Sequence, residues 1–346
     1  MKARSVGAAV ASVLLGLGGC ALPARAQEAN GAPERYLRRM GLGPAQIDSV
    51  AHGHAVVRLL AATNDREVAV FGGIRVDGSR DVLRARALDV ERLLAGSGNR
   101  FHLFGSPATA GDVQEAALDP SEYRALRDCK PGDCNFKMPS SAMKAFLQQV
   151  NWASSDAKSQ ADQLLRTDLL QLVAAYRARG NAATPSYDDA NGVRPGEVFT
   201  ELVAQSPEVY EYAPALQQYL NSYPSGRPAP TRDLLYWSEL RLPHLRPLLT
   251  VNHIVVYAPA HSTAFVARKQ IYASHYFEGA FELLAVADAG AEADSGVYLF
   301  VLRRFRFDSL PAGLMNVRGR VRQELVGATR SDLERERSLL AGTSTP

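Results

Sequence analysis

Two spacings of hydrophobic residues alternate along the chain, and each predicts a different kind of element. Apolar runs within 54–76 are rich in β-branched residues and are joined by Thr63-Asn64-Asp65, which predicts a β-hairpin. After a proline-rich region the pattern returns in three long runs, at 248–259, 265–288 and 296–307. Because these runs combine β-branched and aromatic residues, we expect long antiparallel strands.

Helical spacing dominates three other stretches. Residues 79–96, SRDVLRARALDVERLLAG, are expected to form one helix capped by Ser79. Residues 155–180 form the clearest helix, because apolar residues recur along one stripe and Gly180 can close its end. A last amphipathic helix is expected near 314–338. The stripe of the helix over 155–180 consists of Leu165, Leu169, Leu172, Val173 and Tyr176.

The order of these elements predicts an α+β fold, in which a curved antiparallel sheet with a long C-terminal helix is interrupted by a helical middle region. Several prolines between 207 and 230 divide the middle region into short helices. The expected segments are a signal peptide over 1–26, a leader with a short helix over 27–46, an N-terminal strand-helix-strand block over 47–110, a helical insertion or subdomain over 111–245, antiparallel strands with the C-terminal helix over 246–340, and a disordered tail over 341–346.

The first residues have the layout of an export signal. A basic start precedes an apolar run, and the sequence ARA at 24–26 predicts cleavage after Ala26. The sequence LGGC at 17–20 resembles a bacterial lipobox, so lipidation of Cys20 is the alternative. Both interpretations place the protein in the periplasm or cell envelope, either free or lipid-anchored. The apolar run is too short to favour a permanent membrane helix.

Removing the signal peptide changes the interpretation of the charge. Residues 1–26 hold three basic residues and no acidic one, so 39 − 3 = 36 basic residues remain beside 36 acidic residues. The mature protein is therefore formally neutral. No mature segment combines dense Lys and Arg clustering with interleaved aromatic residues, and we expect no nucleic-acid partner.

The two cysteines of the mature chain lie in the sequence CKPGDC at 129–134. Pro131 and Gly132 suit the two central positions of a type II turn, which can bring Cys129 and Cys134 together. In an oxidising compartment a disulfide is the expected state. The spacing fits neither c-type haem attachment nor a thioredoxin-like motif, and a structural zinc site needs two more ligands.

Three segments carry a resemblance to a known family: DCKPGDCNFKMP at 128–139, LYWSE at 235–239 and KQIYASHYF at 269–277. Together they resemble an uncharacterised family of exported bacterial proteins. That family has no established activity, so the resemblance implies export and assigns no catalytic residue. The order of elements is also similar to START-like helix-grip domains, which implies a sheet wrapped around the C-terminal helix with an apolar cavity between them.

The second of the three long apolar runs carries the strongest candidate site. Read as one strand, it places Tyr272, Ser274, Tyr276 and Glu278 on one face and His275 on the opposite, mainly apolar face. Aromatic side chains with polar groups are typical of the wall of a ligand pocket. The alternative is a solid wall, with half-exposed tyrosines and a hydrogen-bonded His275 in the core.

Catalysis has weaker support in the sequence. The G-x-S-x-G motif of α/β hydrolases does not occur, which leaves His253 or His275 with Tyr or Glu partners as the basis for a hydrolase. Glu239 and Glu278 are candidates for a pair of carboxylates that act as general acid and base.

Other polar motifs favour structural roles. His52 and His54 could share a metal with Asp48, but a convincing further ligand is lacking, so we expect neither a metal nor a cofactor. Tyr236-Trp237 is typical of an anchor at a domain edge more than of a sugar platform. The alternation of Arg and Phe at 303–307 fits a half-buried strand better than a site for anionic lipid.

These patterns predict an exported, non-enzymatic protein that binds an apolar or amphipathic, lipid-like small molecule between the sheet and the last helix. An envelope structural or protein-interaction module is the alternative, and a hydrolase is the second alternative. The expected partners are an apolar small molecule or lipid, or an envelope protein. Peripheral membrane association would follow from lipidation of Cys20.

Overall fold

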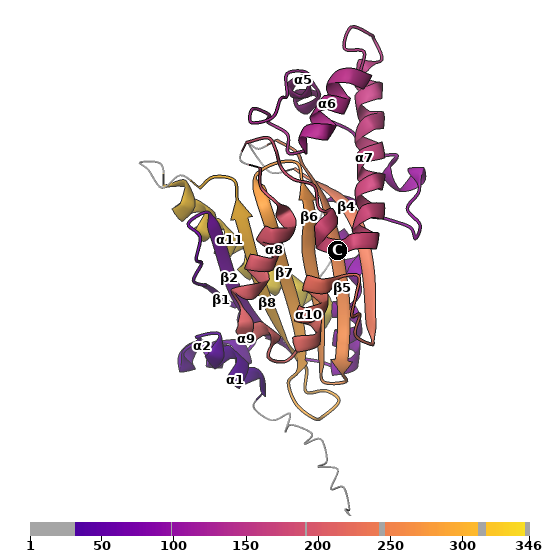
Figure 1. Ribbon diagram of the computed structural model, residues 1–346. Helices are drawn as coiled ribbons and strands as arrows, with labels where there is room; N and C mark the ends of the chain where they lie inside the picture. The colour runs from indigo at the N-terminus through magenta and orange to yellow at the C-terminus, as the bar shows by residue number, and fades with distance from the viewer. Residues whose placement is uncertain (1–31, 98, 191, 242–245, 311–315, 343–346) are drawn as a thin grey trace, which may run out of the picture.

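One curved antiparallel sheet of eight strands runs through the computed structural model, which describes residues 32–97, 99–190, 192–241, 246–310 and 316–342. The strands follow the order β1-β2-β8-β7-β6-β5-β4-β3 (Figure 1). The predicted signal peptide and Cys20 lie outside the described residues, as do residues 343–346 of the predicted tail. The strands are β1 (Val56–Leu59), β2 (Glu67–Val76), β3 (Arg100–Leu103), β4 (Thr231–Leu240), β5 (Leu248–Ala260), β6 (Thr263–Ala273), β7 (Phe277–Asp288) and β8 (Val297–Phe307).

The strands of the N-terminal block lie at both edges of this sheet. The predicted hairpin forms β1 and β2, and β2 pairs with β8 from Glu67 opposite Arg306 to Val76 opposite Val297. Strand β3 pairs with β4 at the other edge. Strand β4 falls inside the range expected to be a helical insertion, and the structure places it in the sheet. Segments far apart in the chain therefore close both edges of the C-terminal meander.

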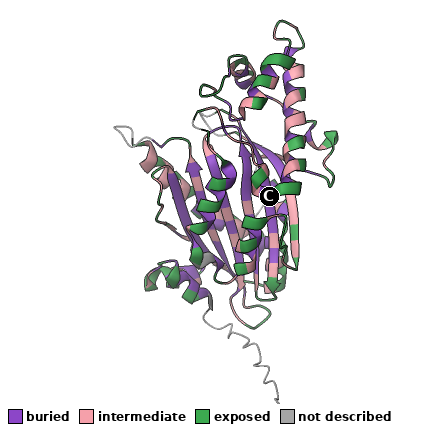
Figure 2. Cartoon of the chain, viewed as in Figure 1, coloured by how far each residue is buried: buried purple, intermediate pink, exposed green. Residues whose placement is uncertain are grey.

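Helices cover both faces of the sheet, which is why β5 is buried along most of its length (Figure 2). We call the two faces the α8 face and the α11 face, and Figure 1 shows helices α8 and α10 in front of the strands with α11 behind them. The α8 face carries α1 (Ala32–Arg39), α2 (Pro44–Ala51), α8 (Pro195–Ala204), α9 (Pro207–Tyr210) and α10 (Pro214–Ser222). The α11 face carries α3 (Arg80–Ala87), α4 (Val90–Ala95) and α11 (Val317–Ala341).

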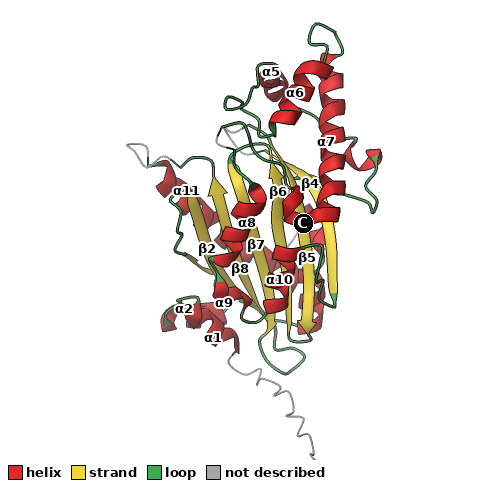
Figure 3. Ribbon diagram, viewed as in Figure 1, coloured by secondary structure: helices red, strands yellow, loops and turns green. Residues whose placement is uncertain are grey.

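The helical middle region projects beyond one end of the sheet (Figure 3). Its longest helix packs its C-terminal half against the sheet, with Leu165, Leu169, Val173 and Tyr176 buried as predicted, whereas Leu172 is only half-buried. Trp237 of β4 joins the same core. The elements of this region are η1 (Ala110–Val113), α5 (Pro120–Leu126), α6 (Ser140–Gln149), α7 (Ala157–Arg179) and η2 (Gly180–Ala183).

The predicted fold class, an α+β sheet with a long C-terminal helix and a helical middle region, is confirmed. The prediction of one helix over 79–96 is wrong, because the chain forms two helices there. Helix α3 ends at Ala87, and α4 begins after Asp89, whose side chain accepts a hydrogen bond from Arg92 N at 3.1 Å. An aspartate at this position satisfies an otherwise unpaired amide, which favours a new helix start over a continuous helix.

The predicted disulfide joins Cys129 and Cys134. Gly132 has a φ of +81°, the conformation that the predicted turn requires of its second central residue. Replacing both cysteines with alanine should lower the free energy of unfolding by about 2 kcal/mol, because the short closed loop no longer restricts the unfolded chain. Urea denaturation checks this value. Reductant should reproduce the loss in the native protein and leave the variant unchanged, and equal stability of both proteins would contradict the prediction.

Candidate functional site

The predicted strand through 265–288 is interrupted, which changes the position of every predicted site residue on it. Strand β6 ends at Ala273 and β7 begins at Phe277, so residues 274–276 form a hairpin turn. Phe277 N donates to His275 O at 2.7 Å inside this turn. The expectation of one continuous strand is therefore wrong, because a tight turn reverses the chain and ends the alternation of faces. Tyr272 and Tyr276 do not share one strand face.

Tyr272 and Ser274 belong to the core between the sheet and the helical middle region. The Tyr272 hydroxyl donates to Lys137 O at 2.8 Å, and its ring packs with Tyr187. Ser274 is fully buried, and its Oγ accepts a hydrogen bond from Leu249 N at 3.0 Å. Burial raises the pKa of Tyr272 well above its ordinary value, so its hydroxyl stays protonated. The polar atoms of both side chains are therefore hydrogen-bonded to backbone groups.

His275 is paired with a carboxylate from the helical middle region. Its Nε2 lies 2.8 Å from Glu122 Oε1, and both side chains are almost fully buried. Glu122 also accepts a hydrogen bond from Asp119 N at the start of α5. Beside this pair lies a polar pocket of about 10 Å³, which also contacts Glu239 and Arg241. That volume holds about one water molecule, so it is too small for a substrate.

Tyr276 is the last residue of the turn, and Glu278 follows it on β7. Tyr276 has a φ of +62°, a left-handed conformation that non-glycine residues rarely adopt, and its hydroxyl accepts a hydrogen bond from Arg246 N at 2.7 Å. Glu278 forms an ion pair with Arg66, and burial raises its pKa despite that partner. Neither Tyr272 nor Tyr276 lines either of the two pockets described in this section. The five predicted residues therefore have three different sets of polar partners, although the rings of His275 and Tyr276 lie 5.5 Å apart.

A second polar cluster, the lysine cluster, is buried where the helical middle region meets the sheet. It consists of Asp233 on β4, His253 on β5 and Lys269 on β6, with Tyr176 and Tyr223 above them. His253 stands directly opposite Lys269 in the strand register. His253 Nε2 lies 2.8 Å from Asp233 Oδ1, and its Nδ1 lies 3.0 Å from the Tyr176 hydroxyl. The ring of Tyr223 packs 4.4 Å from that of His253.

The protonation of His253 follows from its two partners. An ionised Asp233 can only accept hydrogen bonds, so Nε2 donates to it and Nδ1 accepts from the Tyr176 hydroxyl. Burial lowers the pKa of His253 more than Asp233 raises it, which favours the neutral ring. Tyr219 and Arg227 also contact Asp233, at 2.9 and 3.1 Å from Oδ2. Asp233, His253 and Tyr176 therefore form one continuous chain of hydrogen bonds.

Lys269 is fully buried, and the structure records no ion pair for it among the residues it describes. Its Nζ donates to Asn181 Oδ1 and lies 4.2 Å from the ring centre of Phe199 and 5.0 Å from that of Tyr176. Burial alone lowers the pKa of Lys269 to about 7. A large fraction of the amine is therefore neutral near pH 7.

A third buried cluster, the arginine cluster, joins β2, β8 and the end of α8. Arg304 Nη1 lies 2.6 Å from Glu67 Oε1, and Arg306 Nη2 lies 3.4 Å from Glu67 Oε2. Glu67 also accepts a hydrogen bond from Gln205 Nε2, and Arg304 Nε donates to Ser206 Oγ. Successive residues of 303–307 therefore point to opposite faces of the sheet, and the buried side chains of Arg304 and Arg306 point to the α8 face.

The remaining sequence candidates lie apart from one another. Glu239 pairs with Arg100 on β3, whereas Glu278 pairs with Arg66, so the two carboxylates serve different cations. His52 Nδ1 lies 2.8 Å from Asp48 O at the end of α2. Among the described residues, no group of three or more His, Cys, Asp or Glu side chains is arranged to hold a metal ion.

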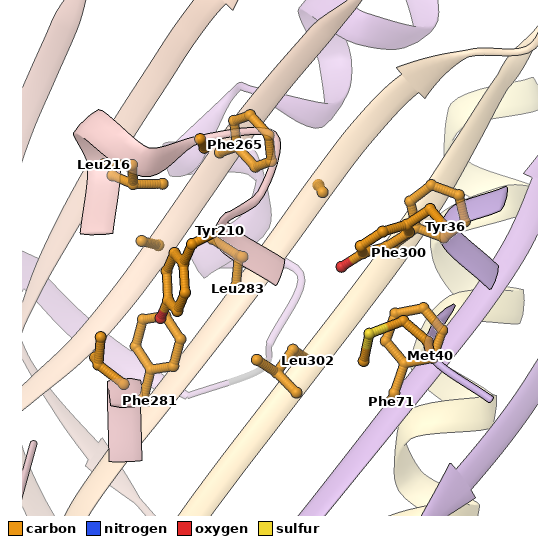
Figure 4. Close-up of a cluster of buried hydrophobic side chains, with 14 of the residues drawn as sticks. Tyr36, Met40, Phe71, Tyr210, Leu216, Phe265, Phe281, Leu283, Phe300 and Leu302 are labelled. Atoms are coloured by element: carbon orange, nitrogen blue, oxygen red, sulfur yellow. The ribbon is translucent and has the colours of Figure 1, made fainter. Parts of the chain in front are cut away.

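An apolar pocket lies on the α8 face, between α1 and strands β6 to β8. Its volume is about 50 Å³, and its lining is almost entirely apolar. Figure 4 shows Phe265 on one side of this region and Phe300 with Tyr36 on the other. The ring centres of Tyr36 and Phe300 are 5.0 Å apart, and those of Tyr36 and Tyr212 are 5.7 Å apart. The walls include Pro33, Tyr36, Tyr212, Phe265, Ala285 and Phe300.

The strand register explains why this region is hollow. Ala285 on β7 is paired with Phe265 on β6 and with Phe300 on β8, and Phe300 is paired in turn with Gly73 on β2. The methyl group of Ala285 lies between the rings of Phe265 and Phe300. Because it is much smaller than either ring, it leaves a depression about as deep as a ring. Helix α1 borders this depression with Pro33 and Tyr36, which keeps it apolar.

Sequence reasoning named His253 as a candidate but missed its partners in the lysine cluster, and it missed the apolar pocket. A signal for Lys269 was present, because it interrupts an apolar face of β6 formed by Phe265, Ala267 and Ile271. The pocket had no comparable signal, since the row of large and small residues spans strands far apart in the sequence.

Comparisons of the chain with protein-family models, with curated proteins and with solved structures give no match. Within the part of the chain that the structure describes, no helix is both long and apolar enough to cross a membrane.

Proposed function

We propose that this protein is exported and binds an apolar or amphipathic, lipid-like small molecule without transforming it chemically. The observation that carries the proposal is the apolar pocket between α1 and the sheet, with its aromatic walls at Tyr36, Phe265 and Phe300. The pocket lies on the α8 face, whereas the sequence led us to expect a cavity beside the last helix. The disulfide of Cys129 and Cys134 supports an oxidising compartment.

The size of the pocket limits what it can hold. A cavity needs about 10–15 Å³ to hold one water molecule, so about 50 Å³ admits several heavy atoms and not a whole lipid. The terminal carbons of an alkyl chain fit this space. Each buried methylene contributes about 0.8 kcal/mol, so about four or five of them correspond to a dissociation constant of roughly 10⁻³ M or weaker for a single chain.

Binding without catalysis is the better interpretation of the buried polar groups. His253 and His275 each have a carboxylate partner, as a hydrolase would require, but neither histidine lines the apolar pocket. The residues that do line it offer almost no polar atoms to a reacting group. An apolar lining holds a ligand through burial alone, which suits a carrier or sensor.

Leucine at position 285 or 287 is expected to fill the pocket and weaken binding of decanol by about fivefold or more, since each variant places a branched side chain where the alkyl end lies. Saturation-transfer NMR measures such weak binding and should show the strongest transfer at the terminal methyl of decanol. Ala260→Leu is the matched control, because Ala260 is exposed at the end of β5 and should bind as the native protein does. Circular dichroism verifies that each variant is folded.

Two results would overturn the proposal. One is the absence of saturation transfer to decanol in the native protein at millimolar concentration. The other is unchanged binding in folded Ala285→Leu and Ala287→Leu, which would place the alkyl chain elsewhere on the molecule.

A further inference from the structure

The apolar pocket lies at a gap in a row of aromatic side chains. This row of cross-strand partners on the α8 face consists of Tyr257 on β5, Phe265 on β6, Ala285 on β7 and Phe300 on β8. The three aromatic members are buried, and the rings of Tyr257 and Phe265 are stacked with their centres 6.5 Å apart. At Ala285 the row lacks a ring, and the pocket opens at that position.

The width of the gap suits one aromatic ring. Neighbouring strands lie about 4.8 Å apart, so Phe265 and Phe300, which flank Ala285 in Figure 4, are separated by roughly twice that distance. A ring midway between them would lie about 5 Å from each, within the range of about 4.5–7 Å over which aromatic pairs attract. The rings of Tyr36 and Phe300 in the pocket wall are already paired at 5.0 Å.

The gap also extends along β7. Ala287 lies two residues beyond Ala285 on the same face and lines the pocket as well. The floor therefore carries only two methyl groups over about 7 Å, which is close to the width of a six-membered ring. A single alkyl chain is narrower and leaves part of this floor uncovered.

The volume of the pocket determines how far a ring can enter. An enclosed apolar cavity of about 150 Å³ holds a whole benzene ring. The pocket has about 50 Å³ and is partly open to solvent, so it takes the leading edge of a ring while the rest lies at the opening.

The pocket lining favours a ring without charge. Among the described residues, none that lines the pocket has a charged side chain, and almost no polar surface faces the space. A charged group inserted there would lose its hydration without gaining a partner, which is costly. A polar group of the ligand therefore stays outside the pocket, in water.

Resting on the proposed function, we propose that the apolar end of the ligand is an uncharged, planar aromatic ring, bound edge-first between Phe265 and Phe300. Aromatic pairs attract one another beyond the contribution of buried area, so the walls stabilise a ring more than an alkyl group of equal area. An alkyl end still enters the pocket through burial alone, and the proposed function does not depend on this assignment.

Three neutral alcohols with nine carbons each test the assignment: phenylpropanol and cyclohexylpropanol, with the ring at the end opposite the hydroxyl, and nonanol. Cyclohexylpropanol has the same skeleton as phenylpropanol and is more hydrophobic, so burial alone would make it the tighter ligand. We expect the reverse order. In saturation-transfer NMR titrations, phenylpropanol should bind at least about twofold more tightly than cyclohexylpropanol, with the strongest transfer at its ring protons.

Phe265→Leu keeps the wall apolar and removes one of its rings. In this variant phenylpropanol should no longer bind more tightly than cyclohexylpropanol, whereas the affinity for nonanol should change less. Phe277→Leu is the matched control, because Phe277 packs against Phe305 and Phe307 and does not line the pocket. This control should keep the preference for phenylpropanol.

Ala285→Leu fills the gap itself and should weaken both ring alcohols, which locates them in the pocket. Circular dichroism verifies that each variant is folded. The comparison of the three alcohols in the native protein needs no variant, so it tests the assignment even if Phe265→Leu fails to fold.

The possible failures are distinguishable. Equal or tighter binding of cyclohexylpropanol to the native protein, at a site that Ala285→Leu blocks, would overturn the aromatic assignment and leave the proposed function standing. A preference for phenylpropanol that persists in folded Phe265→Leu and Ala285→Leu would place the ring outside the pocket and overturn the assignment too. Failure of all three alcohols and of decanol to bind would overturn the proposed function together with this inference.

Discussion

Replacing Lys269 with methionine is expected to raise the free energy of unfolding at pH 7 by several kcal/mol. Lys269 is fully buried, and within the described part of the chain its Nζ contacts Asn181 and two aromatic rings but no carboxylate. Its pKa falls from 10.5 to about 7 on folding, and one pKa unit corresponds to about 1.36 kcal/mol, which gives an upper value of about 5 kcal/mol. Methionine has a similar length and removes the buried charge.

The same substitution should change how stability depends on pH. Between pH 7 and 10.5 the unfolded chain binds a proton at Lys269 that the folded protein has released, so this lysine makes stability rise with pH in that window. The destabilisation is complete below pH 7 and disappears above about pH 10.5. The gain from Lys269→Met should therefore be largest at pH 7 and below, and should shrink steadily as the pH rises.

Urea denaturation of both proteins at several values between pH 6.5 and 9.5 measures this difference. Taking the difference between variant and native protein cancels groups that titrate alike in both. Lys144→Met is the matched control, because Lys144 is exposed on α6 and should give no pH-dependent change. A difference between Lys269→Met and the native protein that does not vary with pH would show that Lys269 keeps an ordinary pKa in the folded protein.

Replacing Glu67 with glutamine should lower the free energy of unfolding by about 3–5 kcal/mol. Glu67 is fully buried, and Arg304 and Arg306 are only 2 % and 4 % exposed. Glutamine keeps the shape of the side chain and removes the one buried negative charge between these two guanidinium groups. The loss would come mainly from leaving buried positive charge without compensation, because the desolvation cost of each arginine remains.

Thermal and urea unfolding measure the effect of Glu67→Gln. Glu201→Gln offers a matched control, since Glu201 also pairs with Arg306 but its side chain is 62 % exposed. The control should lose less than about 1 kcal/mol, as exposed ion pairs do. Equal losses of unfolding free energy in the two variants would show that burial does not determine how much the ion pairs of Glu67 stabilise the protein.

Local patterns were enough to predict several features of this protein. The turn of Pro131 and Gly132 brought Cys129 and Cys134 together, because the conformations it needs are set by those two residues alone. The hairpin of β1 and β2, strands β5 and β8, the helix over 155–180 and the last helix were predicted from the pattern of apolar residues, whereas β4 was not. The α+β class followed from their order.

The positions at which a helix or strand is interrupted were harder to predict. The break at Asp89 and the turn at 274–276 both interrupt runs whose apolar spacing looks continuous. In each case a few hydrogen bonds favour the interruption, and their value depends on what packs beside them. The predicted site at Tyr272 to Glu278 was divided among three sets of polar partners for this reason.

The sequence by itself therefore determined the kinds of elements, their order and the disulfide, since each depends on neighbours within a few residues. Only the tertiary structure decided which strands lie side by side, and with that the candidate site. The apolar pocket exists because Ala285 pairs with both Phe265 and Phe300, and the lysine cluster exists because His253 pairs with Lys269. Strand register is set by the packing of the whole sheet, so no single segment contains that information.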